Sequence, residues 1–360
     1  MLNKILFIRR DNIGDLICTT PAIHAVRKHC PNAKIGILVN SYNAEVVMNN
    51  PDIDEVYIYE KAKHVPEKNK LSVWLNNSKI LIKIRKEKYD MAIACGSYSP
   101  RLARYTYMTQ ARIRIGYSPK NVNKSLFYNM SLKEAEKPMH EVERVFNLLS
   151  PLGIDGLPDK LRVFPSTTEI QRVREFLQRR RSLANARDDR LLSATSGIPF
   201  QNGELLIAFH ISSRKPENRW SAEKFISLAE LILKQKNAEI MLLWSPGSEK
   251  NPYHPGDDEK AELIIKAVPQ IIPYKTNHLR ELIAALSLAN LVVCLDGGTM
   301  HIAAALEKPI VTIWGSTDPH RWRPWGVKHT ILQGSDRKAE NVNVETVFDA
   351  IKQFLKEITR

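Results

Sequence analysis

The sequence has few cysteines, and their spacing excludes the common metal and redox sites. The four are Cys18, Cys30, Cys95 and Cys294. No two of them form a CxxC pair, and none lies with histidines at the spacing of zinc ligands. Cys95 and Cys294 fall in apolar runs that are typical of buried strands. We therefore expect four reduced thiols, a reducing compartment and no metal site.

Long apolar runs are also missing. The longest, at residues 282–295, has about 14 residues, whereas a membrane-spanning helix needs about 20. The apolar stretch at the N-terminus is too short for a signal peptide and ends at Arg9, Arg10 and Asp11. These absences predict a cytoplasmic protein whose contact with a membrane, if it has one, is peripheral.

Neither of the two common glycine motifs for nucleotides is present. There is no GxGxxG pattern and no P-loop, so the sequence has no dinucleotide or ATP fingerprint. Acidic residues are outnumbered, with 39 Asp and Glu against 53 Lys and Arg, and the formal net charge is +14. This surplus favours an anionic partner such as a nucleotide, a phosphorylated glycolipid, a nucleic acid or an anionic membrane. Because the basic residues are scattered and no nucleic-acid motif is present, we expect no nucleic-acid partner.

The sequence does contain a regular alternation of short apolar runs and amphipathic stretches. Hydrophobic residues make up 43% of the 360 residues, enough for a buried core. The expected strands are residues 4–9, 34–40, 56–60, 91–95, 204–210, 238–244, 291–296 and 309–314. The expected helices are residues 15–28, 71–86, 101–110, 138–152, 221–236, 257–268, 277–289 and 343–358. This alternation predicts an α/β fold with a doubly wound parallel sheet in each half.

A polar, basic segment separates the two halves. Pro158 and Pro165 interrupt the pattern, and three consecutive arginines follow at residues 179–181. A run of charge like this one is usually a solvated helix face. We predict an N-terminal domain at 1–165, a junction with a basic insertion at 166–202, a second α/β domain at 203–340 and a closing helix at 341–360.

The first candidate site is the loop RRDNIGD between the first expected strand and helix. Gly14 allows a tight turn, and Asp15 stands where a helix begins. In a doubly wound sheet this loop lies at the carboxyl end of a strand, where ligands bind. A carboxylate there could act as a general base that accepts the proton of an attacking hydroxyl. The pattern fits equally well an aspartate that caps the helix by accepting backbone N–H groups.

The second candidate site is the loop HISSRKPENRW, which follows the first strand of the second half. Ser212 and Ser213 offer hydroxyl groups, and Lys215 and Arg219 offer cations that suit a phosphate. Taken alone, this composition also fits a polar surface loop.

The third candidate site, the motif DGGTMH, has the most specific pattern. A buried strand ends at Asp296, Gly297 and Gly298 let a ligand approach the backbone, and a helix begins near Thr299. The free N–H groups and the dipole of that helix suit a diphosphate. Asp296 itself suits the hydroxyls of a sugar. His301 could donate to phosphate, although a lone histidine on a helix is more often a packing residue.

Together these loops resemble glycosyltransferase family nine, the bacterial heptosyltransferases. The matching segments are RRDNIGDLICTTPA, SSRKPENRW and DGGTMHIAAALEKPIVTIWGSTDP. The resemblance extends over most of the chain except the junction. It implies a GT-B architecture, in which two Rossmann-like doubly wound domains face a central cleft, the first binding the acceptor and the second the nucleotide-sugar donor.

The resemblance also implies an activity and roles for particular residues. The activity is inverting, metal-independent transfer of a heptose from ADP-heptose to a lipopolysaccharide inner-core sugar. It requires no cofactor, because ADP-heptose is a substrate. Asp15 falls on the family's catalytic base. The implied donor contacts are Ser212, Ser213, Arg219, Glu249, Asn277, Leu279, Asp296, Gly297, Gly298, Thr299 and His301.

Two of the implied donor contacts have rivals. The phosphate-binding cation falls on Arg219, but a lysine is common near that position, and Lys215 lies upstream. The ribose-binding acid falls on Glu249, with Asp257 as the alternative. The adenine pocket is expected near Asn277 and Leu279.

The acceptor is less well specified than the donor. Lipopolysaccharide core is anionic and lies at the cytosolic face of the inner membrane, which suits the positive charge and a peripheral location. Arg101 and Arg104 are candidate acceptor contacts, although solvated surface arginines fit the pattern as well. The alternatives are a capsule, another glycan or a protein as acceptor, a nucleotide-sugar epimerase of the same fold, and, from another class, a basic nucleic-acid-binding protein.

Overall fold

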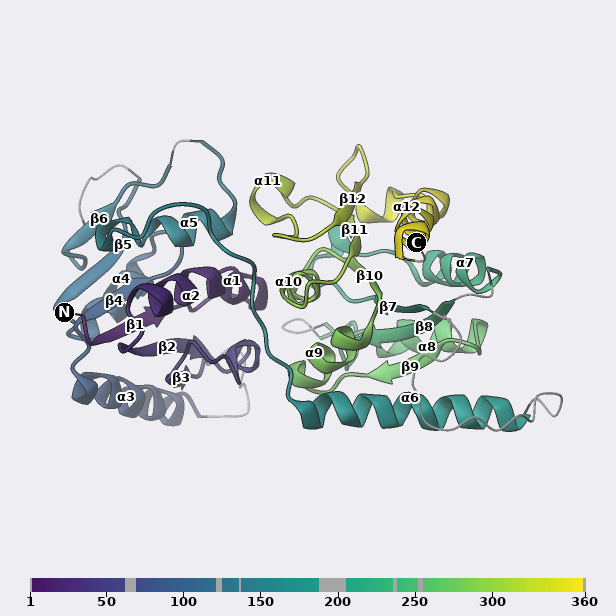
Figure 1. Cartoon of the computed structure of the whole chain (residues 1–360), viewed down its shortest axis with the longest axis horizontal. Helices are drawn as coiled ribbons and strands as arrows, with labels where there is room; N and C mark the ends of the chain where they lie inside the picture. Colours follow the sequence, from purple (N-terminus) through teal and green to yellow (C-terminus); the bar gives the residue numbers. More distant parts are fainter. Residues whose placement is uncertain are drawn as a thin grey trace. The chain divides into compact units, whose positions relative to one another are not determined.

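The computed structural model divides the chain into two compact units (Figure 1). Unit 1 consists of Met1–Phe164 with Asp318–Gly326, and unit 2 of Pro165–Thr317 with Val327–Arg360. The structure describes residues 2–61, 69–120, 125–135, 137–187, 205–235, 238–251 and 255–358.

Unit 1 is built on a six-stranded parallel sheet with the order β3-β2-β1-β4-β5-β6. The strands are β1 Lys4–Ile8, β2 Lys34–Asn40, β3 Glu55–Tyr59, β4 Met91–Ala94, β5 Ile113–Tyr117 and β6 Met130–Leu132. The helices are α1 Ile13–Ile17, α2 Thr20–His29, α3 Lys70–Glu87, α4 Pro100–Met108, α5 Glu141–Asn147 and α11 Pro319–Trp322, with short 3-10 turns at Ala44–Val47 and Ser150–Leu152. The central strands β1, β2 and β4 are almost wholly buried apolar runs, as expected for a parallel sheet covered on both faces.

The helix expected at residues 15–28 is two helices in the structure. α1 ends at Ile17, and α2 begins at Thr20 with Thr19 as its N-cap. Pro21 lacks the N–H for a helical hydrogen bond, and its ring clashes with a preceding turn, so it is tolerated only where a helix starts. The break leaves α1 as a short separate helix that carries Asp15.

Unit 2 repeats the plan with the strand order β12-β11-β10-β7-β8-β9. The strands are β7 Leu205–His210, β8 Ala238–Trp244, β9 Ile272–Lys275, β10 Leu291–Leu295, β11 Ile310–Trp314 and β12 His329–Gln333. The helices are α6 Thr167–Arg187, α7 Ala222–Leu233, α8 Asp258–Ala267, α9 Leu279–Leu288, α10 Gly298–Ala305 and α12 Val344–Ile358, with 3-10 turns at Pro216–Asn218 and Ala339–Asn341. The arginines at residues 179–181 lie on α6, and the predicted junction beyond residue 187 lies outside the described residues.

In both sheets the chain reverses the direction in which it adds strands. From β1 it adds β2 and β3 on one side, and then β4, β5 and β6 on the other. From β7 it adds β8 and β9 on one side, and then β10, β11 and β12 on the other. The positions between β1 and β4 and between β7 and β10 are therefore topological switch points, where such sheets bind ligands beyond the carboxyl ends of their strands. The loops that carry Asp15, Ser212 and Asp296 follow β1, β7 and β10.

Candidate active site

Asp15 lies on α1, shortly beyond the carboxyl end of β1. Its Oδ1 accepts a hydrogen bond from Nη2 of Arg9 at 2.6 Å. Its Oδ2 accepts the backbone N–H of Asn12 at 3.1 Å and the side-chain amide of Asn12 at 3.2 Å. Asn12 is the N-cap of α1, so Asp15 caps the helix from its third residue and not from the N-cap position. The side chain is 14% exposed, so it is not fully buried.

Arg9 is the buried cation that organises this loop. Only 1% of its side chain is exposed, and its Nη2 also donates to Oε1 of Glu141 at 2.8 Å. Its Nε lies 3.4 Å from Oδ2 of Asp11, the other carboxylate of the loop. Burial alone would lower the pKa of Arg9, but the charges of Glu141, Asp15 and Asp11 outweigh burial and raise the pKa. The guanidinium therefore stays charged and holds Asp15 in one orientation.

Glu141, the first residue of α5, is the shared counterion of three arginines. Besides the bond from Arg9, it accepts hydrogen bonds from Nη1 of Arg144 and Nη2 of Arg321, both at 2.8 Å. Burial would raise the pKa of Glu141, but Arg9, Arg144 and Arg321 outweigh burial and lower the pKa to about 2. Arg144 Nη2 also donates to Oγ of Ser97, in the loop after β4, at 2.9 Å. The network therefore joins the loops on both sides of the switch point of unit 1 to α5.

Sequence analysis did not identify this network. Glu141 is 132 residues from Arg9 in the chain, so no local pattern predicts their contact. Arg321 comes from Asp318–Gly326, the segment that returns the chain to unit 1 late in the sequence. That segment is also held by His140, whose Nε2 lies 2.8 Å from the carbonyl oxygen of Arg323.

In unit 2 the corresponding carboxylate is Asp296, directly beyond β10. Its Oδ2 accepts hydrogen bonds from Nδ2 of Asn218 at 2.6 Å and from Oγ1 of Thr317 at 2.5 Å. Both donors are neutral, whereas the donor to Oδ1 of Asp15 is a guanidinium. Burial raises the pKa of Asp296, and the hydroxyl of Thr317 and the charge of Lys215 oppose that rise.

α10 begins directly after Asp296, with Gly297 as its N-cap and Gly298 as its first residue. The N-cap glycine has no side chain with which to cap this end, so the first backbone N–H groups suit an anionic ligand. Thr299 and His301 are only 7% and 3% exposed, because their side chains pack inside unit 2. The site therefore presents the backbone of the two glycines more than the side chains of Thr299 and His301.

The loop after β7 contacts the loop after β10 through Ser213, whose Oγ donates to the carbonyl oxygen of Asp296 at 3.2 Å. Ser212 Oγ accepts a backbone N–H from the loop after β8 at 2.9 Å. Arg219 donates from Nε to the carbonyl oxygen of Ser213 at 3.0 Å and forms an ion pair with Glu249. The structure thus brings these five predicted donor contacts into one connected group.

Asn218 is a residue of this group that sequence analysis missed. Its amide nitrogen donates to Asp296, and its Oδ1 accepts the backbone N–H of Gly315 at 3.2 Å. A Cβ on Gly315 would lie 2.0 Å from the carbonyl oxygen of Glu217, so the loops after β7 and β11 are in direct contact. The motif SSRKPENRW contains Asn218, but its lysine and arginines predict phosphate binding, and nothing in the motif indicates that Asn218 contacts Asp296.

The loop after β9 carries the two residues predicted to lie near the adenine. Asn277 is exposed, and its backbone N–H donates to Oε2 of Glu281 at 2.8 Å. Leu279 is half-buried and is the first residue of α9. Because β9 follows β7 and β8 in the parallel sheet, both residues lie along the same edge as the Asp296 group.

Buried ionisable residues lie beneath the loops of unit 2. Lys260 donates to the carbonyl oxygen of Ile211 at 3.1 Å, and burial lowers the pKa of Lys260 to about 8. His210, at the end of β7, is buried, and burial lowers its pKa to about 4. Asp257 is 2% exposed, and burial raises its pKa. Glu249, the other residue predicted to bind the ribose, has a side chain that is 61% exposed.

Arg101 and Arg104 are exposed on α4 of unit 1 and, being three residues apart, lie on one side of that helix. The neighbouring Tyr105 contacts Arg10, whose guanidinium carbon lies 4.0 Å from the centre of the ring. Arg10 directly follows the organising cation Arg9. α4 is therefore linked to the Asp15 loop, with its two predicted acceptor contacts on the outside.

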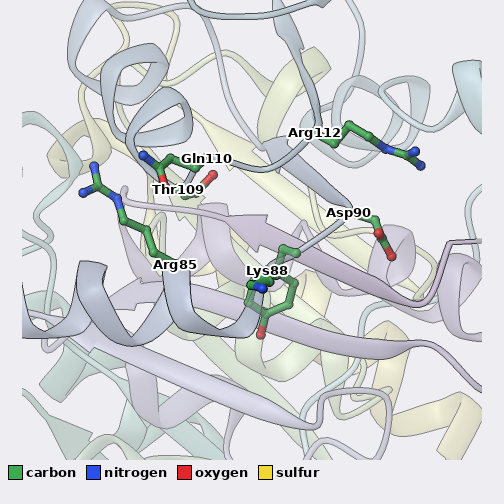
Figure 2. A pocket seen from close by; sticks show the side chains of 7 residues that line it. Arg85, Lys88, Asp90, Thr109, Gln110 and Arg112 are labelled. Carbon is green, nitrogen blue, oxygen red and sulfur yellow. The ribbon is translucent and has the colours of Figure 1, made fainter.

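A pocket of about 300 Å³ lies elsewhere in unit 1 (Figure 2). It is lined by Arg85, Lys88, Tyr89, Asp90, Thr109, Gln110 and Arg112. These residues directly precede β4 and β5, so the pocket is at the amino ends of the strands, away from Asp15. It does not belong to the candidate active site.

The described ranges hold no candidate for a metal site or for a membrane-spanning helix. They contain no group of three or more His, Cys, Asp or Glu residues that could hold a metal ion. No helix within them is long and apolar enough to cross a membrane. None of the four cysteines, all of which lie in the described ranges, forms a disulfide bond, and all except Cys30 are buried.

The sequence is similar to known proteins over most of its length. The family model described as glycosyltransferase family 9 (heptosyltransferase) matches residues 78–352. Lipopolysaccharide heptosyltransferase 3 of Escherichia coli is 25% identical over 314 residues, covering 87% of this chain and 83% of that protein. Lipopolysaccharide heptosyltransferase 1 of E. coli K12 is 20% identical over 353 residues, covering 97% and 99%.

Solved structures match the fold over almost the whole chain. A family 9 glycosyl transferase from Veillonella parvula has a TM-score of 0.77 at 22% identity, covering 99% of this chain and 97% of its own. The E. coli heptosyltransferase WaaC with ADP has a TM-score of 0.69 at 19% identity, covering 98% and 97%. These matches confirm the predicted GT-B class, with its two parallel Rossmann-like sheets.

Proposed function

The chain belongs to glycosyltransferase family 9, the heptosyltransferase family, and on that premise we propose that it transfers a heptose from ADP-heptose to a lipopolysaccharide inner-core acceptor. Similar proteins support both substrates, since they include lipopolysaccharide heptosyltransferases and a heptosyltransferase solved with ADP. The observation that carries the proposal is the pair of carboxylates Asp15 and Asp296, each beyond a central strand at the switch point of its own sheet. Transfer is inverting and needs no metal ion, with Asp15 as the general base.

On the donor side, the task is to stabilise the leaving group. Breaking the bond between the anomeric carbon and the diphosphate oxygen puts positive charge on the sugar and negative charge on ADP. The N–H groups at the start of α10 and the guanidinium of Arg219 stabilise the departing diphosphate. The contacts of Arg219 with Ser213 and Glu249 support this role, because they orient the guanidinium before the donor binds. Asp296 accepts hydrogen bonds from the heptose hydroxyls.

The remaining donor contacts hold the nucleoside. Glu249 binds the ribose hydroxyls, and its exposure supports it over the buried Asp257. Asn277 and Leu279 border the adenine. Their place along the same sheet edge as Asp296 is consistent with a nucleotide that extends from β10 towards β9.

On the acceptor side, the hydroxyl oxygen attacks the anomeric carbon from the face opposite the diphosphate. The new carbon–oxygen bond forms as the bond to ADP breaks, so the anomeric centre is inverted, and the hydroxyl proton passes to Asp15. Arg9 and Asn12 each donate to a carboxylate oxygen of Asp15 and so hold the carboxylate in place, and the lone pairs that they leave can receive that proton. Arg101 and Arg104 attract the anionic acceptor, as does the net charge of +14.

Acceptor dependence tests this proposal against its main rivals. ADP release from ADP-heptose is measured with and without lipopolysaccharide whose inner core lacks the heptose. We expect release only when the acceptor is present. Conversion of the donor without an acceptor would favour a nucleotide-sugar epimerase. Activity with a capsule, another glycan or a protein, and none with the lipopolysaccharide, would keep the transferase and overturn the proposed acceptor.

A further inference from the structure

The outer face of α3 carries apolar side chains where a surface helix is normally polar. Leu71, Trp74, Leu75 and Ile82 are 60%, 63%, 46% and 50% exposed. With about 3.6 residues per turn, these four positions lie on one face of the helix. We refer to them as the α3 stripe.

Packing within unit 1 does not explain the α3 stripe. The helix is attached through its other side, where Val73 and Ile84 are buried and Ile80 packs against the apolar core under the sheet. These three positions lie about half a turn from the stripe. The stripe therefore faces outwards, away from the sheet that α3 covers.

Positive charge borders the α3 stripe. The exposed lysines of α3 that form no ion pair with a described residue are Lys70, Lys79 and Lys86. Lys79 and Lys86 each lie four residues after a member of the stripe, at the spacing of neighbours on a helix. The one acidic residue of α3, Glu87, is bound by Lys4 and Lys34. The surface is thus apolar along its centre and positive along its edge.

The end of α4 extends this surface. Arg85 of α3 donates from Nε to the carbonyl oxygen of Met108 at 2.7 Å, so the last turn of α4 lies beside the second half of α3. Met108 and its neighbour Tyr107 are both exposed. Over the described part of the chain, every exposed large apolar side chain except Leu263 belongs to unit 1. The apolar surface is therefore a feature of unit 1.

We propose that the α3 stripe docks unit 1 on the surface of an anionic phospholipid bilayer, with α3 lying in the plane of the interface. Tryptophan is favoured at the level of the headgroups, and lysines beside an apolar stripe add attraction to anionic lipids. The charge argues against a second copy of this chain as the occupant, because two α3 surfaces would bring their lysines together. Docking by an interfacial helix places the protein on the membrane without crossing it.

The test is flotation of the full-length protein with vesicles of phosphatidylethanolamine and phosphatidylglycerol, compared with vesicles of phosphatidylcholine alone. The wild type floats with the anionic vesicles and not with the neutral ones. Trp74→Ser combined with Leu75→Ser weakens binding about tenfold or more, because the buried apolar area is lost. Lys79→Gln combined with Lys86→Gln weakens it roughly twentyfold, because each basic residue near an anionic surface contributes a factor of about five.

Two controls separate docking from general effects of mutation. Leu263→Ser removes an apolar side chain of similar exposure from unit 2 and leaves flotation unchanged. Trp74→Phe keeps an aromatic ring, so it preserves binding but removes the blue shift of indole emission that anionic vesicles cause in the wild type. Circular dichroism confirms that each variant is folded, as expected for substitutions of exposed side chains.

The inference is overturned if the wild type does not float with anionic vesicles, or if the α3 variants bind as well as the wild type. It is also overturned if Leu263→Ser weakens binding as much as the α3 variants do. Sedimentation that shows a wild-type dimer and a monomeric Trp74→Ser, Leu75→Ser variant would assign the stripe to a second copy instead. None of these measurements involves ADP-heptose, so docking and the proposed function can fail separately.

Discussion

The two units place a carboxylate at the same position in sheets of the same topology but surround it differently. Asp15 of unit 1 is held by the buried guanidinium of Arg9. The same guanidinium also donates to Glu141. Asp296 of unit 2 is held by the amide of Asn218 and the hydroxyl of Thr317. The topology determines where each carboxylate lies, and its partners determine what it can do.

The difference suits the two roles that we propose for these carboxylates in a transfer reaction. A general base must keep one orientation, and the ionic network of unit 1 provides it at the expense of burying several charges. A donor site must accept a negative diphosphate close to its own carboxylate. In unit 2 the neutral donors hold Asp296, and the start of α10, whose N-cap is Gly297, suits the phosphate.

Asp15→Asn is expected to give the largest effect and would separate the two tasks. An amide cannot take the acceptor's proton, so kcat falls about 10²- to 10⁴-fold. The affinity for ADP is expected to stay unchanged, because we propose that the nucleotide binds unit 2. Steady-state kinetics and calorimetry measure the two quantities. Asp11→Asn, which changes the more exposed carboxylate of the same loop, is the matched control and keeps most of the activity. Full activity in Asp15→Asn would remove Asp15 from the mechanism.

Glu141→Gln tests the ionic character of unit 1. It removes the counterion that Arg9, Arg144 and Arg321 share, so the free energy of unfolding falls by about 3–5 kcal/mol. Glu249→Gln, which removes the exposed partner of Arg219 in unit 2, lowers it by about 1 kcal/mol or less. Urea unfolding of both variants gives the comparison. Equal and small losses would mean that the network of unit 1 has no special role in stability.

Lowering the pH is expected to reduce stability in two separate pH ranges, one set by His210 of unit 2 and the other by Glu141 of unit 1. Burial lowers the pKa of His210 to about 4 from about 6.5, so the unfolded chain binds the proton first and stability falls as pH drops from 6.5 to 4. The loss is about 3 kcal/mol, at about 1.4 kcal/mol per pH unit. The lowered pKa of Glu141, about 2, means that its contribution is kept above pH 4.5 and is lost between 4.5 and 2.

The variant His210→Gln isolates that effect. Its midpoint of thermal unfolding should fall less between pH 7 and pH 5 than the wild-type midpoint does. The pKa of His140 in unit 1 is also lowered by burial, so part of the wild-type slope remains in the variant. An unchanged slope would show that His210 does not titrate as its burial implies.

Asn218→Ala is expected to give a smaller effect than Glu141→Gln, because it removes a neutral donor from a charged acceptor. The free energy of unfolding falls by about 1.5–3 kcal/mol. Asn218→Asp places a second carboxylate against Asp296 and is more destabilising, since like charges repel at this distance. If the aspartate were tolerated as well as the alanine, Asp296 would not be ionised in the folded protein.

The sequence predicts the fold better at the centre of each sheet than at its edges. Central strands such as β1, β7 and β10 are continuous apolar runs, which is the pattern of a parallel strand buried on both faces. The strands β5, β6, β9 and β12 were not predicted. β6, β9 and β12 are edge strands, and their sequences MSL, IPYK and HTILQ mix polar and apolar residues.

The site was predictable where its signal is local. Asp15 and Asp296 stand in short motifs at strand ends, and both lie at switch points in the structure. Their partners could not be predicted in this way, because Glu141 is 132 residues from Arg9, and Asn218 is 78 residues from Asp296. Such contacts depend on the tertiary fold, which no spacing within one loop encodes. The roles assigned to the site residues remain predictions for the variants above.

We propose that Asp15 acts as the base and that Asp296 binds the donor. Calorimetry of ADP-heptose binding to Asp15→Asn and Asp296→Asn tests this assignment most directly. Loss of charged hydrogen bonds to the sugar should weaken binding to Asp296→Asn about 10- to 100-fold, while Asp15→Asn stays within about twofold of the wild type. Equal weakening in both variants, or weakening in Asp15→Asn alone, would contradict the assignment of the donor to unit 2 and of the base to unit 1.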